Sequence, residues 1–198
     1  MARRSVRLPA PGSRVIFPRD SHPEPPVSLS QPMQDALNAQ IREEFTAFYL
    51  YLSMSAHCEA VNFPGFAKWL RAQASEEQGH ALKIFDYVQD RGGQVALQAL
   101  PQPAHQWKSL LELFEQARDH ERKVTASINR LYEVAAAEKD YASHAFLEWF
   151  LTEQIEEEKT STQLADTLRM AGDHPGALLM LDREAGARSG AGAEESAE

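Results

Sequence analysis

Cysteine and long apolar runs are scarce in this sequence. The 198 residues include a single cysteine, Cys58, which excludes an internal disulfide and favours a reducing, cytoplasmic compartment. No apolar run approaches the roughly 20 residues that a membrane-spanning helix requires, and the first residues lack the apolar stretch of a secretory signal. We therefore expect a cytoplasmic protein with no membrane segment.

Basic residues are outnumbered, and the excess negative charge is unevenly distributed. The formal net charge is −9, from 20 basic and 29 acidic residues. Residues 1–29 contain five arginines against Asp20 and Glu24, a balance of +3, so the remainder of the chain carries −12. Because an acidic body attracts cations and repels phosphate backbones, we do not expect a nucleic-acid partner.

Glycine and proline are also sparse between Gln31 and Gly172, outside two connections. Alanine, leucine, glutamate and glutamine are abundant there, and all four residues favour helices. Hydrophobic residues make up 43% of the chain, which is enough for one sizeable core. Composition and length therefore predict a single all-α domain.

The two ends of the chain differ in composition from its centre. Residues 1–29 are rich in proline, arginine and serine and show no periodicity, which predicts a disordered extension. A targeting segment, or a true start at Met33, would also explain this composition. We expect the folded domain to comprise residues 30–187, and the small, acidic residues 188–198 to form a disordered tail.

Apolar residues recur every three or four positions in four long stretches, which is the pattern of amphipathic helices. Ser30, Ser109 and Asp140 are suited to cap the first turns of three of them. After Gly172, a short apolar piece at 178–181 indicates a fifth helix. The four long helices are expected at residues 30–60, 66–91, 109 to about 135, and 141–171.

The connection between the second and third helices is long and contains prolines. Its residues, 92–108, can span roughly 55 Å when extended, whereas a helix of about 28 residues is roughly 42 Å long. The connection can therefore run the whole length of a bundle and leave these two helices parallel. This predicts a four-helix bundle with a long crossover, distinct from a simple up-down-up-down bundle.

Each long helix carries acidic or amide residues near its midpoint, on the stripe that should face the core. A carboxylate buried alone is very costly, because its hydration is lost and nothing replaces it. Several at one depth are reasonable if a multivalent cation lies among them, although a single glutamate on such a stripe more often reaches out to water. The residues are Glu44, Glu77 with His80, Glu121, and Gln154 with Glu157.

Glu77 and His80 are three residues apart and share one helical face, the E-x-x-H unit of carboxylate-bridged di-metal bundles. The fourth helix lacks a second E-x-x-H and reads E-Q-I-E-E-E at 153–158. One metal then has no histidine ligand, and we expect it to bind weakly and to exchange. Oxygen donors with one imidazole suit iron or manganese, and zinc can compete.

A third, all-oxygen metal site is predicted beside the two metals of this centre. A tyrosine also lies on the inward stripe of the first helix. The alternative to a third site is a solvated acidic face. Tyr51 follows Glu44 by two helical turns and is expected to donate an electron, to hydrogen-bond a ligand, or simply to pack in the core. The candidate residues of the third site are Glu76, Glu153, Glu156 and Glu157.

At these residues the sequence resembles a bacterial non-haem ferritin, over about residues 33–186. Four stretches carry the resemblance. They are L-N-A-Q-I-R-E-E-F at Leu37–Phe45, E-E-Q-G-H at Glu76–His80, H-E-R at His120–Arg122, and F-L-E-W-F-L-T-E-Q-I-E-E-E-K at Phe146–Lys159.

The resemblance implies a ferritin-like bundle with a short fifth helix and a ferroxidase centre in which Glu77 bridges two irons. It also implies that the predicted third site binds iron and that Tyr51 belongs to the centre. Copies of the chain would form a homo-oligomeric 24-subunit cage, in which Fe²⁺ is oxidised by O₂ or H₂O₂ and stored as a ferric mineral. The ferroxidase ligands would be Glu44, Glu77, His80, Glu121 and Gln154.

Two departures from related proteins bear on haem and on rival functions. Bacterioferritins carry a haem-ligating methionine just after the second-helix glutamate, where this chain has Gln78, so we expect no haem. A di-iron oxygenase or peroxidase that keeps its metals is one rival, and a DNA-protecting miniferritin, favoured by the arginine-rich first residues, is another. An inert helical scaffold is the third.

Overall fold

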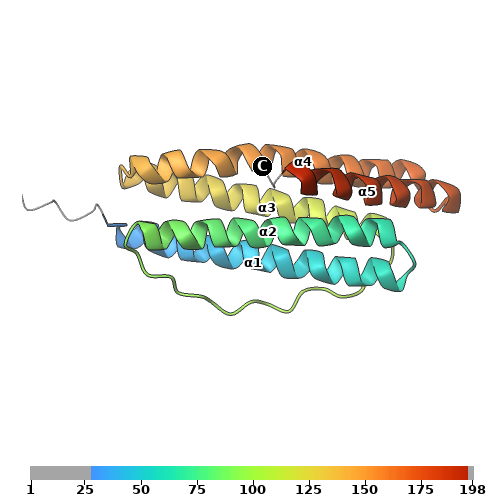
Figure 1. The fold of residues 1–198 in the computed structure, drawn as a ribbon, viewed down its shortest axis with the longest axis horizontal. Helices are drawn as coiled ribbons and strands as arrows, with labels where there is room; N and C mark the ends of the chain where they lie inside the picture. Colours follow the sequence, from blue (N-terminus) through green and yellow to red (C-terminus); the bar gives the residue numbers. More distant parts are fainter. Residues whose placement is uncertain (1–27, 196–198) are drawn as a thin grey trace, which may run out of the picture.

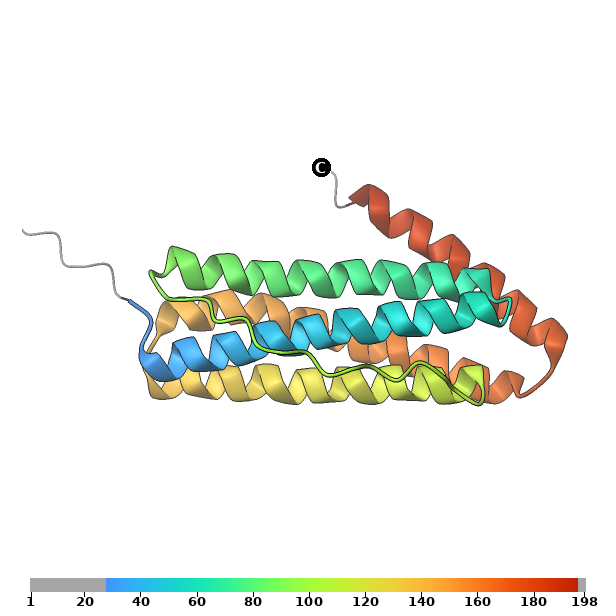
Figure 2. The same ribbon diagram turned by 90° about the horizontal axis from the view of Figure 1, so that it is seen from below.

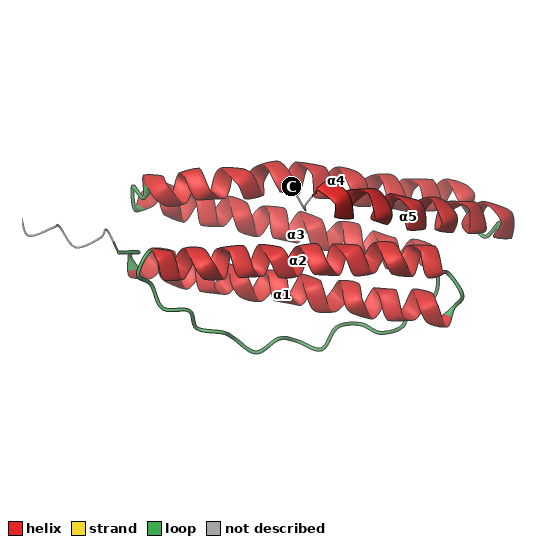
Figure 3. Ribbon diagram, viewed as in Figure 1, coloured by secondary structure: helices red, strands yellow, loops and turns green. Residues whose placement is uncertain are grey.

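A computed structural model describes residues 28–195, with side chains as far as residue 187. This part of the chain contains five helices and no strand (Figures 1 and 3), which confirms the all-α prediction. Residues 1–27, on which most of the predicted extension falls, lie outside the described part. The helices are α1 (Gln31–Ala60), α2 (Pro64–Asp90), α3 (Leu110–Ala137), α4 (Tyr141–Ala171) and α5 (Pro175–Glu195).

Three of the helices begin at the caps that the sequence predicts. The hydroxyl of Ser30 accepts a hydrogen bond from the backbone N–H of Met33 at 3.3 Å. Ser109 accepts from the N–H of Glu112 at 3.1 Å, and Asp140 caps α4 in the same way. Each cap satisfies a donor that the first helical turn leaves without a partner.

The long connection between α2 and α3 runs along the outside of α1 from one end of the bundle to the other (Figures 1 and 2). Asn38 of α1 holds it at one end: its side-chain NH₂ donates to the Gln94 carbonyl at 2.9 Å, and its oxygen accepts from the Ala96 N–H at 2.7 Å. Farther along, Ser53 donates to the Ala104 carbonyl at 2.6 Å. Helices α2 and α3 are therefore parallel, and the predicted crossover is confirmed.

The core consists of two apolar clusters, one towards each end of the bundle, and every long helix passes from one to the other. Along α2, for example, one cluster includes Phe66 and Leu70 and the other includes Ile84 and Val88. The four buried glutamates of α1 to α4 lie in the gap between the clusters. In α1 to α4 the gap contains Glu44, Glu77 with His80, Glu121, and Gln154 with Glu157.

Helix α5 folds back from the end of α4, crosses the start of α2 and then leaves the bundle (Figure 2). The two backbones meet closely at Gly65: a Cβ added there would lie 1.8 Å from the carbonyl oxygen of Asp182. The buried carboxylate of Asp182 accepts a hydrogen bond from the Phe66 N–H at 2.8 Å. Because Phe63, the residue before α2, makes no side-chain cap, α5 supplies the cap that α2 lacks.

Helix α5 also differs from the sequence-based boundary. We placed the end of the folded domain at residue 187, whereas the helical backbone continues to Glu195. The alanine and glutamate residues of this segment favour helix, whereas its small, acidic composition had led us to expect a disordered tail. The side chains after residue 187, and residues 196–198, lie outside the described part.

We predict that Asp182→Ala lowers the free energy of unfolding by about 1 kcal/mol, the usual effect of removing an N-terminal cap. Asp182→Asn keeps an acceptor oxygen and should lose less. Denaturant unfolding followed by circular dichroism measures both, with Asp173→Ala, on an exposed residue of the α4–α5 connection, as the control. Equal stability of Asp182→Ala and the wild-type protein would show that α2 does not depend on this cap.

Candidate metal centre

Four helices bring carboxylates into the middle of the bundle, where water is excluded. Glu77 and Glu121 are fully buried, and Glu44 is 1% exposed. His80, Gln154 and Glu157 are buried in the same layer. The sequence predicts this layer correctly, because each residue lies on the inward stripe near the midpoint of its helix.

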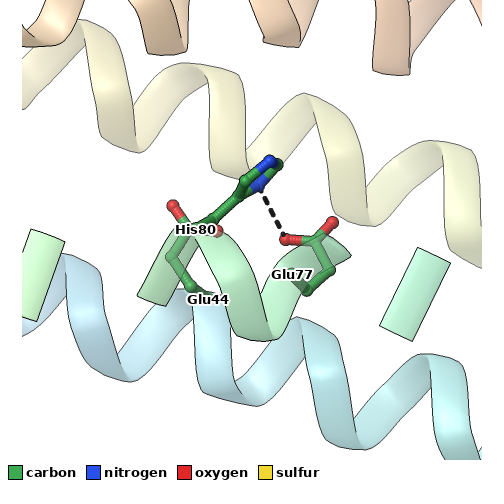
Figure 4. Close-up of side chains that lie close together, drawn as sticks. All are labelled: Glu44, Glu77 and His80. Carbon is green, nitrogen blue, oxygen red and sulfur yellow. Dashed lines mark ion pairs between the residues drawn. The ribbon is translucent and has the colours of Figure 1, made fainter. Parts of the chain in front are cut away.

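Glu44, Glu77 and His80 point towards one another (Figure 4). One donor atom from each lies within 4.8 Å of the other two, and Nδ1 of His80 is 3.5 Å from an oxygen of Glu77. Donors that each sit roughly 2.1 Å from one ion are roughly 3 to 4 Å apart. A slight contraction of this group would therefore accommodate a divalent cation.

The carboxylate of Glu77 has few partners apart from the imidazole of His80 and the side chain of Glu44. Within the described residues, neither of its oxygens forms a hydrogen bond to a neighbouring donor, and one oxygen of Glu44 has none either. Burial, followed by the negative charges of Glu121 and Glu157, raises the pKa of Glu77 well above its usual range. An unsatisfied buried carboxylate is costly, and a bound cation would remove that cost.

Glu121 and Gln154 lie beside this group and are joined by hydrogen bonds. The hydroxyl of Tyr51 donates to one oxygen of Glu121 at 2.5 Å, and the side-chain NH₂ of Gln154 faces the other at 3.5 Å. Glu121 is therefore held by Tyr51 and Gln154, and its charge acts on Glu77 of the three-residue group. Of the roles considered for Tyr51, the structure shows two: packing in a core cluster and a hydrogen bond to a candidate ligand.

The predicted third site is only partly assembled. Donor atoms of Glu76, Glu153 and His80 lie within 4.8 Å of one another, so this group shares the histidine with the first. Glu157 is buried next to it, and Gln73 donates to both of its oxygens at 3.4 Å. Glu156 is exposed and lies outside the group.

Burial and mutual repulsion favour the neutral forms of these acids. Burial raises the pKa of Glu44 to about 8, and the negative charge of Glu77 adds to the effect. Burial likewise raises the pKa of Glu157 to about 8 and that of Glu121 to about 7. Near neutral pH, protons therefore neutralise part of the negative charge that a bound cation would otherwise neutralise.

Comparison with known proteins decides the family. Residues 34–171 match the Ferritin-like domain family. This chain belongs to the ferritin family. A bacterial non-heme ferritin of Staphylococcus haemolyticus is 40% identical over 161 residues, which cover 81% of this chain and 97% of the relative. That of Staphylococcus aureus strain USA300 is 38% identical over the same length and the same shares.

Solved structures agree with this assignment. The open pore ferritin of the hyperthermophilic archaeon Archaeoglobus fulgidus matches with a TM-score of 0.79 and 43% identity, over 80% of this chain and 98% of that one. A closed form of the same ferritin, engineered by mutagenesis, matches equally well over 97% of its length. The expected ferritin-like bundle with a fifth helix is therefore confirmed.

Sequence reasoning missed two amides that support the buried acids of this ferritin. Gln40 donates to Glu44 at 2.8 Å and accepts from the Ser127 hydroxyl of α3 at 2.5 Å, while Gln73 supports Glu157 as described above. Gln40 and Gln73 each precede an inward glutamate, Glu44 or Glu77, by four residues. An amide one helical turn before a buried acid is the signal that would have identified Gln40, whereas Gln73 donates across to Glu157 of α4.

A tryptophan covers the outer side of the shared histidine. Trp149 meets the ring of His80 edge-to-face, with ring centres 5.3 Å apart, and Nζ of Lys83 lies 3.9 Å from the centre of the Trp149 ring. Trp149 also packs edge-to-face against Phe150. The contact with His80 means that this packing also restricts the histidine ring.

We predict that the metal-free protein loses stability as the pH rises from about 5 to about 8. Over this range the folded state holds protons on Glu44 and Glu157 that the unfolded chain releases at lower pH, so raising the pH favours unfolding. Denaturant unfolding at several pH values measures the slope, and added Zn²⁺ should stabilise the protein more at pH 8 than at pH 5.5.

Two variants control this measurement. Glu44→Gln removes one of the raised acids and should flatten the profile, whereas Glu43→Gln changes its neighbour, whose side chain is 41% exposed, and should not. Parallel profiles for the wild-type protein and Glu44→Gln would contradict the electrostatic account.

Proposed function

We propose that this ferritin stores iron by binding Fe²⁺ among its buried carboxylates, oxidising it there and passing Fe³⁺ to a mineral inside a protein cage. The observation that supports the proposal is Glu77, a fully buried carboxylate that lies among other acids, with the imidazole of His80 3.5 Å away as its ion-pair partner. Membership of the ferritin family supports iron as the cation, and the relatives are named as non-heme ferritins.

The side chains suit two divalent ions, with Glu77 between them. Glu44, Glu77 and His80 would hold the first ion, and Glu121 with Gln154 the second, on the other side of Glu77. The negative charge of Glu121, which helps to raise the pKa of Glu77, supports this arrangement, because it acts only over a short distance in the bundle. Three carboxylates offset much of the charge of two Fe²⁺ ions, and the buried Glu157 supplies a fourth.

The oxidation needs an electron acceptor and a transfer of protons. The buried acids support the transfer of protons. Two Fe²⁺ ions give one electron each to O₂, and two protons complete H₂O₂. We propose O₂ or H₂O₂ as the oxidant. Protons that metal binding displaces from Glu44 and Glu157 are released within this layer. Tyr51, whose pKa burial raises well above its usual value, remains protonated and holds Glu121 in place.

The two halves differ in a way that favours release of the product. The first half has an imidazole, whereas the second offers a neutral amide, Gln154, in place of a charged ligand. The third group, Glu76 and Glu153 with His80, combines an exposed and a half-buried acid with a buried histidine. We propose that this group receives iron that passes between solvent and the centre. The exposed Glu156 would contribute only by attracting iron ions through its negative charge.

The structure bears on two rival functions. The proposed ligands come from one chain, and a fifth helix is present, which favours storage over a DNA-protecting miniferritin with ligands shared between subunits. An oxygenase would retain both metals, and the amide in α4 makes the second position a weak one. Within the described residues, no helix is long and apolar enough to cross a membrane.

We also propose a homo-oligomeric cage of 24 subunits in the cytoplasm. Exposed apolar side chains along α1 and the crossover support an association between subunits: Tyr49 is 48% exposed and Leu97 67% exposed. The sole cysteine, Cys58, is buried and free, as suits a reducing compartment.

Aerobic addition of Fe²⁺ to the purified protein tests the proposal. We expect rapid growth of ferric absorbance, uptake of many irons per chain and a particle far larger than one subunit. Glu77→Gln should slow the initial oxidation by at least about tenfold, because it removes the carboxylate proposed to bridge, and should not destabilise the metal-free protein. Glu43→Gln is the control and should behave like the wild-type protein.

Two outcomes would separate the rival functions. Uptake that stops at two irons per chain on a small oligomer would favour an oxygenase, and unchanged oxidation by Glu77→Gln would favour an inert scaffold. In the same assay, Glu76→Gln with Glu153→Gln should leave oxidation of the first two irons intact and slow the later ones. Slowing of the first two would instead place these acids in the centre itself.

A further inference from the structure

A threonine of α3 lies between the two residues proposed to hold the second ion. The hydroxyl oxygen of Thr125 is 3.1 Å from the backbone carbonyl oxygen of Glu121 and 3.2 Å from the side-chain oxygen of Gln154. Both neighbours are acceptors, and a hydroxyl has only one proton to donate. Thr125 can therefore satisfy one of them at a time, and which one depends on the orientation of the Gln154 amide.

In the structure, both ends of the Gln154 amide face protein groups. Its oxygen faces Thr125, and its NH₂ group faces the Glu121 carboxylate at 3.5 Å. The other oxygen of Glu121 accepts from Tyr51. Both oxygens of Glu121 thus face a donor, and the amide oxygen of Gln154 is turned away from the position where it could ligate an ion.

Rotating the amide by half a turn produces an arrangement suited to metal. The NH₂ group of Gln154 would then donate to the Thr125 hydroxyl, and Thr125 would donate to the Glu121 backbone carbonyl. The amide oxygen would lie beside the free oxygen of Glu121. Two oxygens facing each other repel without a cation and are ligands with one, so metal would decide between the two orientations.

We propose that Thr125 is a positioning residue that stabilises the Gln154 amide in both orientations, so that the amide turns when the second ion binds. The inference rests on the proposed function, because it requires an ion between Glu121 and Gln154. It gives the weaker half of the centre a defined metal-free state, in which hydrogen bonds take the place of the ion.

Anaerobic titration with Co²⁺, followed by its visible absorption, tests this role without any turnover. The wild-type protein should bind two ions per chain, the first at the histidine-containing half. Thr125 makes one hydrogen bond in the present orientation and would make two in the rotated one, so its removal costs the metal-bound orientation one hydrogen bond more. Thr125→Val, which has the same shape but no hydroxyl, should therefore bind the second ion about fivefold more weakly and leave the first unchanged. Thr125→Ser, which keeps the hydroxyl, should restore the second affinity.

A double-mutant cycle with Gln154→Glu separates this role from general packing. A carboxylate offers an oxygen in either orientation, so the effect of Thr125→Val on the second affinity should vanish in the Gln154→Glu background. An undiminished effect there, or equal second affinities for Thr125→Val and wild type, would overturn the inference. Thr125→Ala replaces Thr125→Val in the cycle if the latter does not assemble.

The titration also distinguishes this inference from the proposed function. Failure of the wild-type protein to bind two ions per chain would contradict the proposed centre itself. Binding of two ions with no dependence on Thr125 would leave the centre intact and overturn only the amide rotation.

Discussion

Repulsion among buried carboxylates is the constraint on which the rest of the structure depends. Glu44, Glu77 and Glu121 share the dry middle of the bundle, and each raises the pKa of at least one of the others, after burial itself. Apart from His80, the neighbours that stabilise them are hydroxyls and amides, which donate hydrogen bonds without a compensating charge. The layer is therefore under strain when metal-free, and cations or protons relieve that strain.

The remainder of the fold keeps this layer in place. Two apolar clusters clamp the four helices above and below it, and capped first turns fix the helix ends. The crossover, tied to α1 through Asn38, lets α2 and α3 run parallel. Glu77 and Glu121 come from separate halves of the chain and meet at mid-height because each lies near the midpoint of its helix. The two apolar clusters stabilise the fold, so the residues of the central layer can serve metal binding instead of close packing.

Much of this could be predicted from the sequence, because helical periodicity fixes both the inward stripe and the depth of each residue. Glu44, Glu77 and Glu121 are buried at mid-helix as expected, and the caps at Ser30 and Ser109 follow from local chemistry. Partners across helices could not be predicted, since they depend on helix rotation and side-chain rotamers. The contact of Thr125 with Gln154, the exposure of Glu156 and the approach of α5 to Gly65 all belong to that class.

Anomalous X-ray diffraction from crystals soaked in Zn²⁺ tests the central claim most directly, because it locates ions without relying on catalysis. The account predicts strong peaks between Glu44, Glu77 and His80, with a weaker one towards Glu121. Ions found only on exposed acids of the surface, with the central carboxylates unchanged and empty, would contradict it.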